Sequence, residues 1–73
     1  MYLYCMHDLN DTKEYLVSKG YRVLMQICED KFLFLIQDKK NKDKVIRIGG
    51  LFNNACIQDT IQRINYMINN WEV

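Results

Sequence analysis

Three short stretches in the middle of the chain have the apolar spacing of β-strands. Residues 21–28 largely alternate between apolar and polar side chains, and so do residues 44–48. Between them, residues 32–36 are five consecutive apolar side chains. Alternation with many β-branched and aromatic residues is typical of strands that are buried on one side, whereas a continuous apolar run indicates a strand that is apolar on both sides.

The segments that separate these strands are short and polar. Glu29 and Asp30 lie between the first two strands and predict a tight hairpin, although Asn-Gly would suit such a turn better. Residues 39–43 form the second turn and contain three lysines. Two consecutive glycines, Gly49 and Gly50, are expected to end the third strand.

A helical period is clearest near the C-terminus. Five apolar residues follow a spacing of four, three, four and three: Ile57, Ile61, Ile64, Ile68 and Trp71. This spacing aligns them on one side of a helix, which we expect to pack on the sheet because two heptads are too few for a coiled coil. Asn53 or Asn54 can cap its start.

A second, shorter helix is predicted over residues 11–19. Asp11 can cap it and Glu14 follows three residues later, which is the acidic variant of a capping box. Gly20 is suited to the left-handed conformation that ends many helices.

This order of elements predicts one small domain that spans residues 1–73. Its class is α+β, with a helix, a three-stranded antiparallel meander and a second helix. The first six residues are open to two interpretations, an additional N-terminal strand or a tail packed on the sheet.

Side-chain parity through the hairpins divides the sheet into two unequal faces. Pairing around the first turn places three apolar pairs on one face, namely Ile27 with Phe32, Met25 with Phe34, and Val23 with Ile36. Ile46 and Ile48 join this face if the second loop has three or five residues, and the sequence leaves the register around Asn41 open. We expect the two helices to cover this face.

The opposite face keeps an apolar strip for which the chain has no further helix. Leu24, Leu33, Leu35 and Val45 form the strip, and burying all four would contribute about 6–10 kcal/mol. Arg22, Lys31, Arg47 and two glutamines frame it. Three covers are open: residues 2–6, a second copy of the chain, or a different protein. An apolar centre with a polar rim is typical of protein interfaces.

Composition narrows the classes of function. Hydrophobic residues make up 49% of the chain, which argues against disorder, and the net charge of +1 favours neither nucleic-acid binding nor mimicry of nucleic acid by acidic groups. The apolar start is too short for a signal peptide or a membrane span, so we expect a cytosolic protein without membrane contact. Three cysteines, an odd number, predict free and mostly buried thiols.

The residues that could carry chemistry are few. Cys5 and His7 offer two metal ligands, whereas zinc needs four, and no nucleophile motif accompanies them. Asp8, Asp11 and Glu14 fit the favourable charge at a helix start. The paired glycines lack the spacing and the lysine of a phosphate loop. We therefore predict no catalytic residue, no metal and no cofactor.

The lysine-rich turn supports an alternative function. Four lysines lie within six residues: Lys39, Lys40, Lys42 and Lys44. They could contact phosphates, which would make the chain a nucleic-acid-binding module, although such a run is more often a solvated hairpin tip that protects a sheet edge.

The order of elements resembles two families. It is similar to the double-stranded RNA-binding domain, but residues 49–56 contain no lysine where that family has its phosphate-binding motif. It also looks like the compact phage-encoded anti-CRISPR inhibitors of RNA-guided nucleases, over roughly residues 10–72. Lys, Asn, Ile and Tyr, whose codons are rich in A and T, supply 27 of the 73 residues, which fits a bacterium or phage.

The second resemblance implies a non-enzymatic inhibitor of a bacterial defence nuclease or another host complex. Because the chain is nearly neutral, inhibition would use a contact patch or a homodimer. The predicted contact residues are Leu24, Leu33, Leu35, Val45 and Arg47.

Overall fold

The computed structural model describes residues 2–72, with side chains described from His7 onward. It contains five elements: α1 (Tyr2–Ser18), β1 (Tyr21–Cys28), β2 (Lys31–Asp38), β3 (Val45–Leu51) and α2 (Asn54–Glu72). The strands form one antiparallel sheet in the order β1-β2-β3. This confirms the predicted α+β class and the αβββα order.

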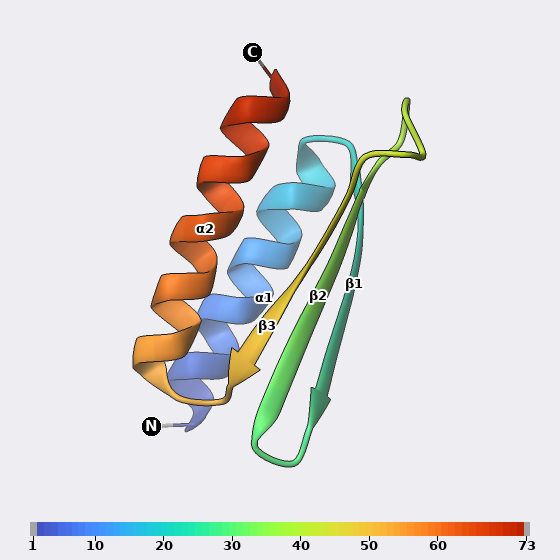
Figure 1. Cartoon of the computed structure of the whole chain (residues 1–73). Coiled ribbons are helices and arrows are strands. Elements are labelled where there is room, and N and C mark those ends of the chain that lie inside the picture. Colours follow the sequence, from blue (N-terminus) through green and yellow to red (C-terminus); the bar gives the residue numbers. More distant parts are fainter. Residues whose placement is uncertain (1, 73) are drawn as a thin grey trace.

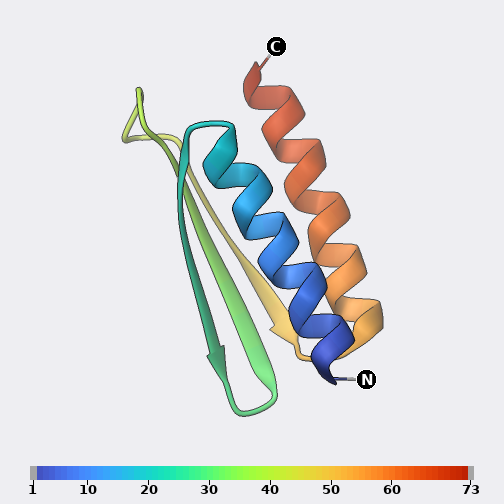
Figure 2. The same ribbon diagram turned by 180° about the vertical axis from the view of Figure 1, so that it is seen from behind.

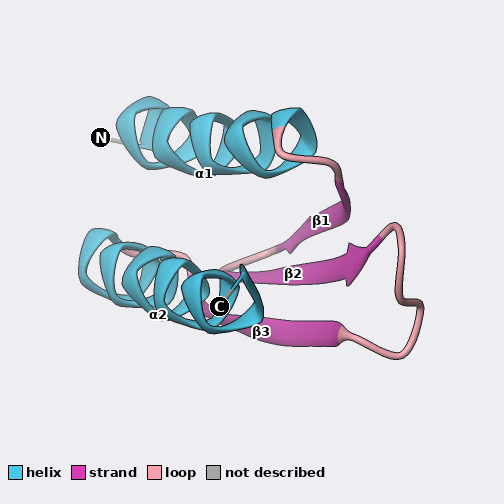
Figure 3. Cartoon of the chain, turned by 90° about the horizontal axis from the view of Figure 1, so that it is seen from above, coloured by secondary structure: helices cyan, strands magenta, loops and turns pink. Residues whose placement is uncertain are grey.

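The elements form two layers. Both helices lie on the same side of the sheet and run in the same direction, and no element of the described residues 2–72 lies on the other side (Figures 1 and 2). Seen from above, α1 is nearer β1 and α2 is nearer β3 (Figure 3). No helix within residues 2–72 is both long enough and apolar enough to cross a lipid bilayer.

The first helix is longer than the sequence indicated. It begins at Tyr2, so the predicted N-terminal strand and the predicted start at Asp11 are both wrong. Leu9, Thr12 and Leu16 are buried at helical spacing, and the Thr12 hydroxyl donates a hydrogen bond to the carbonyl oxygen of Asp8 at 2.9 Å. The stripe was hard to recognise because its middle member is a threonine. Gly20, with a φ of 99°, follows the helix as predicted.

The longer helix also changes the role of its acidic residues. Asp8, Asp11 and Glu14 lie inside α1 and not at its start, so their predicted capping role is wrong. Asp11 instead pairs with His7, one helical turn earlier, at 3.2 Å. Asp8 accepts a hydrogen bond from Gln58 at 2.7 Å and thereby joins α1 to α2.

The second helix agrees with its apolar pattern. Asn53 caps it, because its side-chain oxygen accepts a hydrogen bond from the backbone N–H of Cys56 at 2.8 Å. Ile57, Ile64 and Ile68 are buried, and Ile61 and Trp71 pack against the core. The 4-3-4-3 spacing therefore marks the side of α2 that faces the sheet.

The core lies between the helices and the inner face of the sheet. All three predicted pairs across the first hairpin are present, and Ile46 and Ile48 join them opposite Ile36 and Phe34. Phe34 and Ile36 are fully buried, and Phe32 is 3% exposed. One face of the sheet is therefore sufficient to complete the core.

The third strand departs from its predicted end. It continues through Gly49 and Gly50 to Leu51, because these residues pair with Leu33, Phe32 and Lys31. The glycines are thus part of the ladder and not a break after it.

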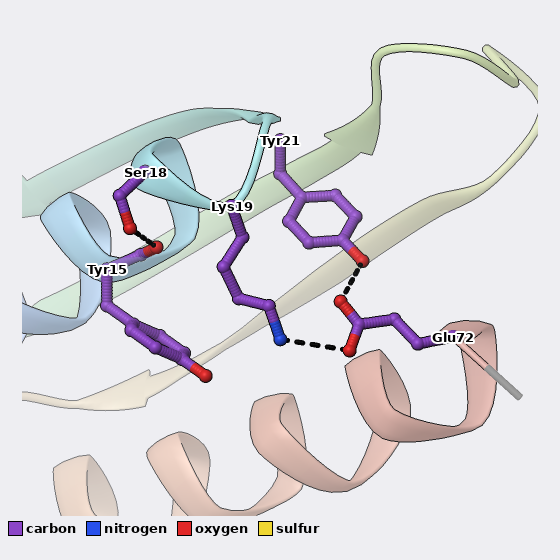
Figure 4. Close-up of polar contacts among 5 residues, drawn as sticks. All are labelled: Tyr15, Ser18, Lys19, Tyr21 and Glu72. Atoms are coloured by element: carbon purple, nitrogen blue, oxygen red, sulfur yellow. Dashed lines mark hydrogen bonds and ion pairs between the residues drawn. The ribbon is translucent and has the colours of Figure 1, made fainter.

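A polar contact fixes the end of α2 against the start of the sheet (Figure 4). Glu72 accepts hydrogen bonds from Lys19 at 2.9 Å and from the Tyr21 hydroxyl at 3.1 Å. The Lys19 hydrogen bond is the main cause that lowers the pKa of Glu72, and the same bond raises the pKa of Lys19. Burial, followed by the bond to Glu72, raises the pKa of Tyr21.

Candidate protein-interaction surface

Alternate side chains of the three strands point away from the helices and form what we call the outer face. The register arranges them in four rows across the sheet: Arg22-Gln37-Val45, Leu24-Leu35-Arg47, Gln26-Leu33-Gly49 and Cys28-Lys31-Leu51. All five residues predicted as contact residues lie in these rows, and the described part of the chain places no element over them.

The outer face is apolar and exposed to solvent. Leu24 is 60% exposed, Val45 is 52% exposed and Leu51 is 49% exposed, while Leu33 and Leu35 are half-buried between their neighbours. A hollow of about 450 Å³ lies on this face, and its lining includes Leu24, Leu35, Val45 and Arg47. The predicted strip is therefore one continuous surface.

The interpretation in which residues 2–6 cover this strip is wrong. Their backbone forms the first turns of α1, which belongs to the helix layer on the other side of the sheet (Figure 2). This removes one of the three covers that the sequence left open and leaves a second copy and a different protein.

The charges of the outer face all have one sign. Its ionisable groups other than the Cys28 thiol are Arg22, Lys31 and Arg47, and the four rows contain no carboxylate and no aromatic ring. The phenylalanines of β2 point into the core instead. Aromatic rings on a sheet are the usual platform for stacking unpaired bases, so this face lacks the groups needed to bind single-stranded nucleic acid in that way.

The two ends of the sheet carry opposite charges. The turn between β1 and β2 consists of Glu29 and Asp30, both exposed, and we call it the acidic turn. The connection between β2 and β3, residues 39–44, is the lysine loop, and it turns away from the helix layer (Figures 1 and 2). Lys39, Lys40 and Lys42 are exposed, whereas Lys44 is half-buried.

The lysine loop has a defined conformation. Lys40 N–H donates to the Asp38 carboxylate, and Asp43 N–H donates to the Asn41 side chain, each at 3.0 Å. Gln37, on the outer face, donates to the carbonyl oxygen of Lys42 at 3.0 Å. Two of these bonds use backbone atoms of Lys40 and Lys42 and none uses a lysine side chain, so the ammonium groups take no part in them.

The cysteines and the histidine belong to no metal-binding cluster among the residues whose side chains are described. Cys28 is exposed and Cys56 is half-buried, so the predicted burial of the thiols is wrong for Cys28. The His7 side chain is 72% exposed. Residues with described side chains include no group of three or more metal-ligating side chains. The side chain of Cys5, which the sequence paired with His7, lies outside the described part.

Sequence reasoning missed one apolar member of the outer face. Leu51 was excluded because the glycines were expected to end the strand, but it is half-exposed and pairs with Lys31. Continuing the alternation from Val45 through Arg47 and Gly49 would have placed Leu51 on the same side.

Comparison with known proteins adds nothing to this geometry: the chain matches no protein-family model, no curated protein and no solved structure.

Proposed function

We propose that this chain is a non-enzymatic protein-interaction module that binds another polypeptide through its outer face. The observation that carries this proposal is that five apolar side chains lie on a face that no described element covers, although the core is complete without them. Contiguous apolar surface surrounded by polar side chains is typical of protein contact sites.

The partner class that we propose follows from the order of elements. Several compact anti-CRISPR inhibitors have a similar αβββα order, and a bacterial CRISPR-type nuclease is therefore the first target to test, followed by other complexes of a bacterial cytoplasm. The chain would act by occupying a contact surface, because its near-neutral charge does not suit imitation of nucleic acid.

The test compares an outer-face variant with a helix variant. Leu24→Glu with Val45→Glu places two carboxylates on the outer face, at positions more than half exposed, so that the fold tolerates them. Tyr66→Glu with Val17→Glu makes the same chemical change at exposed helix positions. Nuclease inhibition and binding to purified nuclease complexes are measured, with circular dichroism to verify folding.

We expect the outer-face variant to lose partner binding by about 100-fold or more, because two buried carboxylates without partners cost several kcal/mol. The helix variant should bind as the wild type does. Equal binding by the folded outer-face variant would contradict the proposal.

The alternative function, binding of nucleic acid, uses the three exposed lysines of the lysine loop. Asp43 lies within that loop and Asp38 directly precedes it. Their two negative charges halve the positive charge of the four lysines. This function predicts an affinity that falls steeply with salt and a shallower slope after Lys39, Lys40 and Lys42 are changed to alanine. A gel-shift experiment at low salt distinguishes it from protein binding.

A further inference from the structure

We propose that, in the absence of its target, the outer face binds a second copy of this chain, stacked sheet on sheet with its strands antiparallel to the first. This inference rests on the proposed function and deepens it, since the second copy and the target would use the same surface in turn. The dimer has a twofold axis, which lies midway between the two sheets and is perpendicular to the strands.

The rows of the outer face are complementary under this rotation. The row of Leu24, Leu35 and Arg47 lies over the row of Gln26, Leu33 and Gly49 in the second copy. Leu35 of each copy then contacts Leu33 of the other at the centre, where a rotation of about 30° between stacked sheets moves side chains least.

The same rotation gives one of the two arginines of the outer face a place to lie. Arg47 lies over Gly49 of the second copy, where the missing side chain leaves room for its long aliphatic part. Val45 lies over Leu51, so that two half-exposed apolar side chains cover each other at the edge.

Charge selects this arrangement over the other twofold stacking. With antiparallel strands, the acidic turn of each copy lies over the lysine loop and Arg22 of the other, and the contact occurs twice. With parallel strands, acidic turn would meet acidic turn and lysine loop would meet lysine loop. Opposite charges at matching ends favour the first stacking, and like charges oppose the second.

The size of the face agrees with a reversible dimer. Three strands about 4.8 Å apart, with seven or eight residues rising about 3.4 Å each, give a footprint of roughly 400 Å² per copy. The turn and the loop extend it at both ends. The total for two copies lies below the range of stable interfaces and within that of weak ones, so we expect a dissociation constant on the order of 100 µM.

The arrangement closes on itself. Each outer face is used once, and the helices remain on the two outsides of a four-layer dimer. A heterologous contact on the same surface would instead leave an unused face and would continue into a filament.

The experiment exchanges the charges at the two ends. Variant one reverses the acidic turn (Glu29→Lys with Asp30→Lys), variant two reverses part of the lysine loop (Lys40→Glu with Lys42→Glu), and variant three carries all four changes. A control, Glu14→Lys with Asp59→Lys, makes the charge change of variant one on the exposed helix surfaces. Sedimentation equilibrium measures dimerisation from about 1 µM to about 1 mM, and circular dichroism verifies folding.

We expect the wild type and the control to dimerise equally. Variants one and two should dimerise at least about tenfold more weakly, and variant three should return to within about threefold of the wild type. Only antiparallel stacking produces that recovery, because parallel stacking would again place like charges together in variant three. Leu33→Glu with Leu35→Glu should abolish dimerisation.

Three outcomes would overturn the inference: a wild type that stays monomeric throughout, a variant three weaker than variants one and two, or unchanged dimerisation of the folded Leu33→Glu, Leu35→Glu protein. A monomeric wild type whose nuclease binding is lost in the Leu24→Glu, Val45→Glu variant would overturn the second copy as occupant while supporting the proposed function.

Discussion

The two adjacent glycines of β3 should differ sharply in their tolerance of a side chain. Gly49 lies on the outer face opposite Leu33, and Gly50 lies on the inner face opposite Phe32. A Cβ at Gly49 would collide with the carbonyl oxygen of Phe32 and lie 3.0 Å from the Cα of Leu33, whereas a Cβ at Gly50 would lie 3.8 Å from the Cβ of Cys56. The first contacts are with backbone that cannot rotate away, and the second is ordinary van der Waals contact.

The expected cost of Gly49→Ala follows from what must move. Separating β3 from β2 at this point loses one or two ladder hydrogen bonds at about 1 kcal/mol each, with strain of about 1–3 kcal/mol. Replacing a strand glycine by alanine returns about 0.5–1 kcal/mol. The net loss is about 1–4 kcal/mol, out of a total of about 4–11 kcal/mol expected for this chain length. For Gly50→Ala we expect no loss, or a gain of up to about 1 kcal/mol.

Urea unfolding measures both variants, with Trp71 as the fluorescent probe. Trp71 packs against the core, and its ring centroid lies 6.0 Å from that of Tyr21. With a slope of about 1 kcal/mol per M, the midpoint of Gly49→Ala should fall by about 1–4 M relative to the wild type. A Gly49→Ala midpoint equal to that of Gly50→Ala would refute the reasoning, because the close approach of the β2 backbone would then carry no cost.

Three further predictions concern stability. Glu72→Gln should lower stability at neutral pH, because it removes the negative charge that pairs with Lys19 and one of the two side-chain oxygens that accept from Lys19 and Tyr21. Because the pKa of Glu72 is lowered on folding from its ordinary value of 4.5, this difference from the wild type should shrink as the pH falls below that value and through the lower folded pKa; a difference that does not shrink in urea titrations at acid pH would speak against it. The pKa values of Lys19 and Tyr21 are raised on folding, so wild-type stability should also fall as the pH rises above about 10. Glu29 has a φ of 56°, a conformation that asparagine adopts more readily, so Glu29→Asn should raise the free energy of unfolding by about 0.5–1 kcal/mol, and an unchanged urea midpoint would show that the turn carries no strain.

The sequence predicted best those parts of the fold in which every buried position, at the spacing of a strand or of a helix, is occupied by an apolar residue. The strands, their pairing around Glu29 and Asp30, and the stripe of α2 belong to this class, because a shift of one residue would expose the whole inner face. The start of α1 was missed because Thr12 occupies a buried position that is normally apolar. Its hydroxyl is satisfied within the helix, so burial does not require a partner from another element.

Apolar periodicity also predicted most of the outer face. The prediction was incomplete because it left out Leu51. Parity identified Leu24, Leu33, Leu35 and Val45, since side chains of β2 cannot all face one way. The glycines then concealed Leu51, because Gly-Gly is a common end signal and the close contact that requires Gly49 is visible only in three dimensions. In the proposed dimer, the orientation of the second copy depends on groups outside the sheet, at the turn and the loop.

The exposure of the outer face also sets how strong its association can be. Leu33 and Leu35 are already half-buried, so full burial of the strip returns less than the 6–10 kcal/mol expected from the sequence. The main gain comes from Leu24, Val45 and Leu51, which are 60, 52 and 49% exposed. At about 1.5–3 kcal/mol for each complete side chain, covering them contributes about 2–5 kcal/mol per copy. Association costs about 4–15 kcal/mol in lost freedom, so two such faces leave a weak net affinity. The apolar strip therefore supplies the attraction, and the charged ends of the sheet have to determine which partner and which orientation it selects.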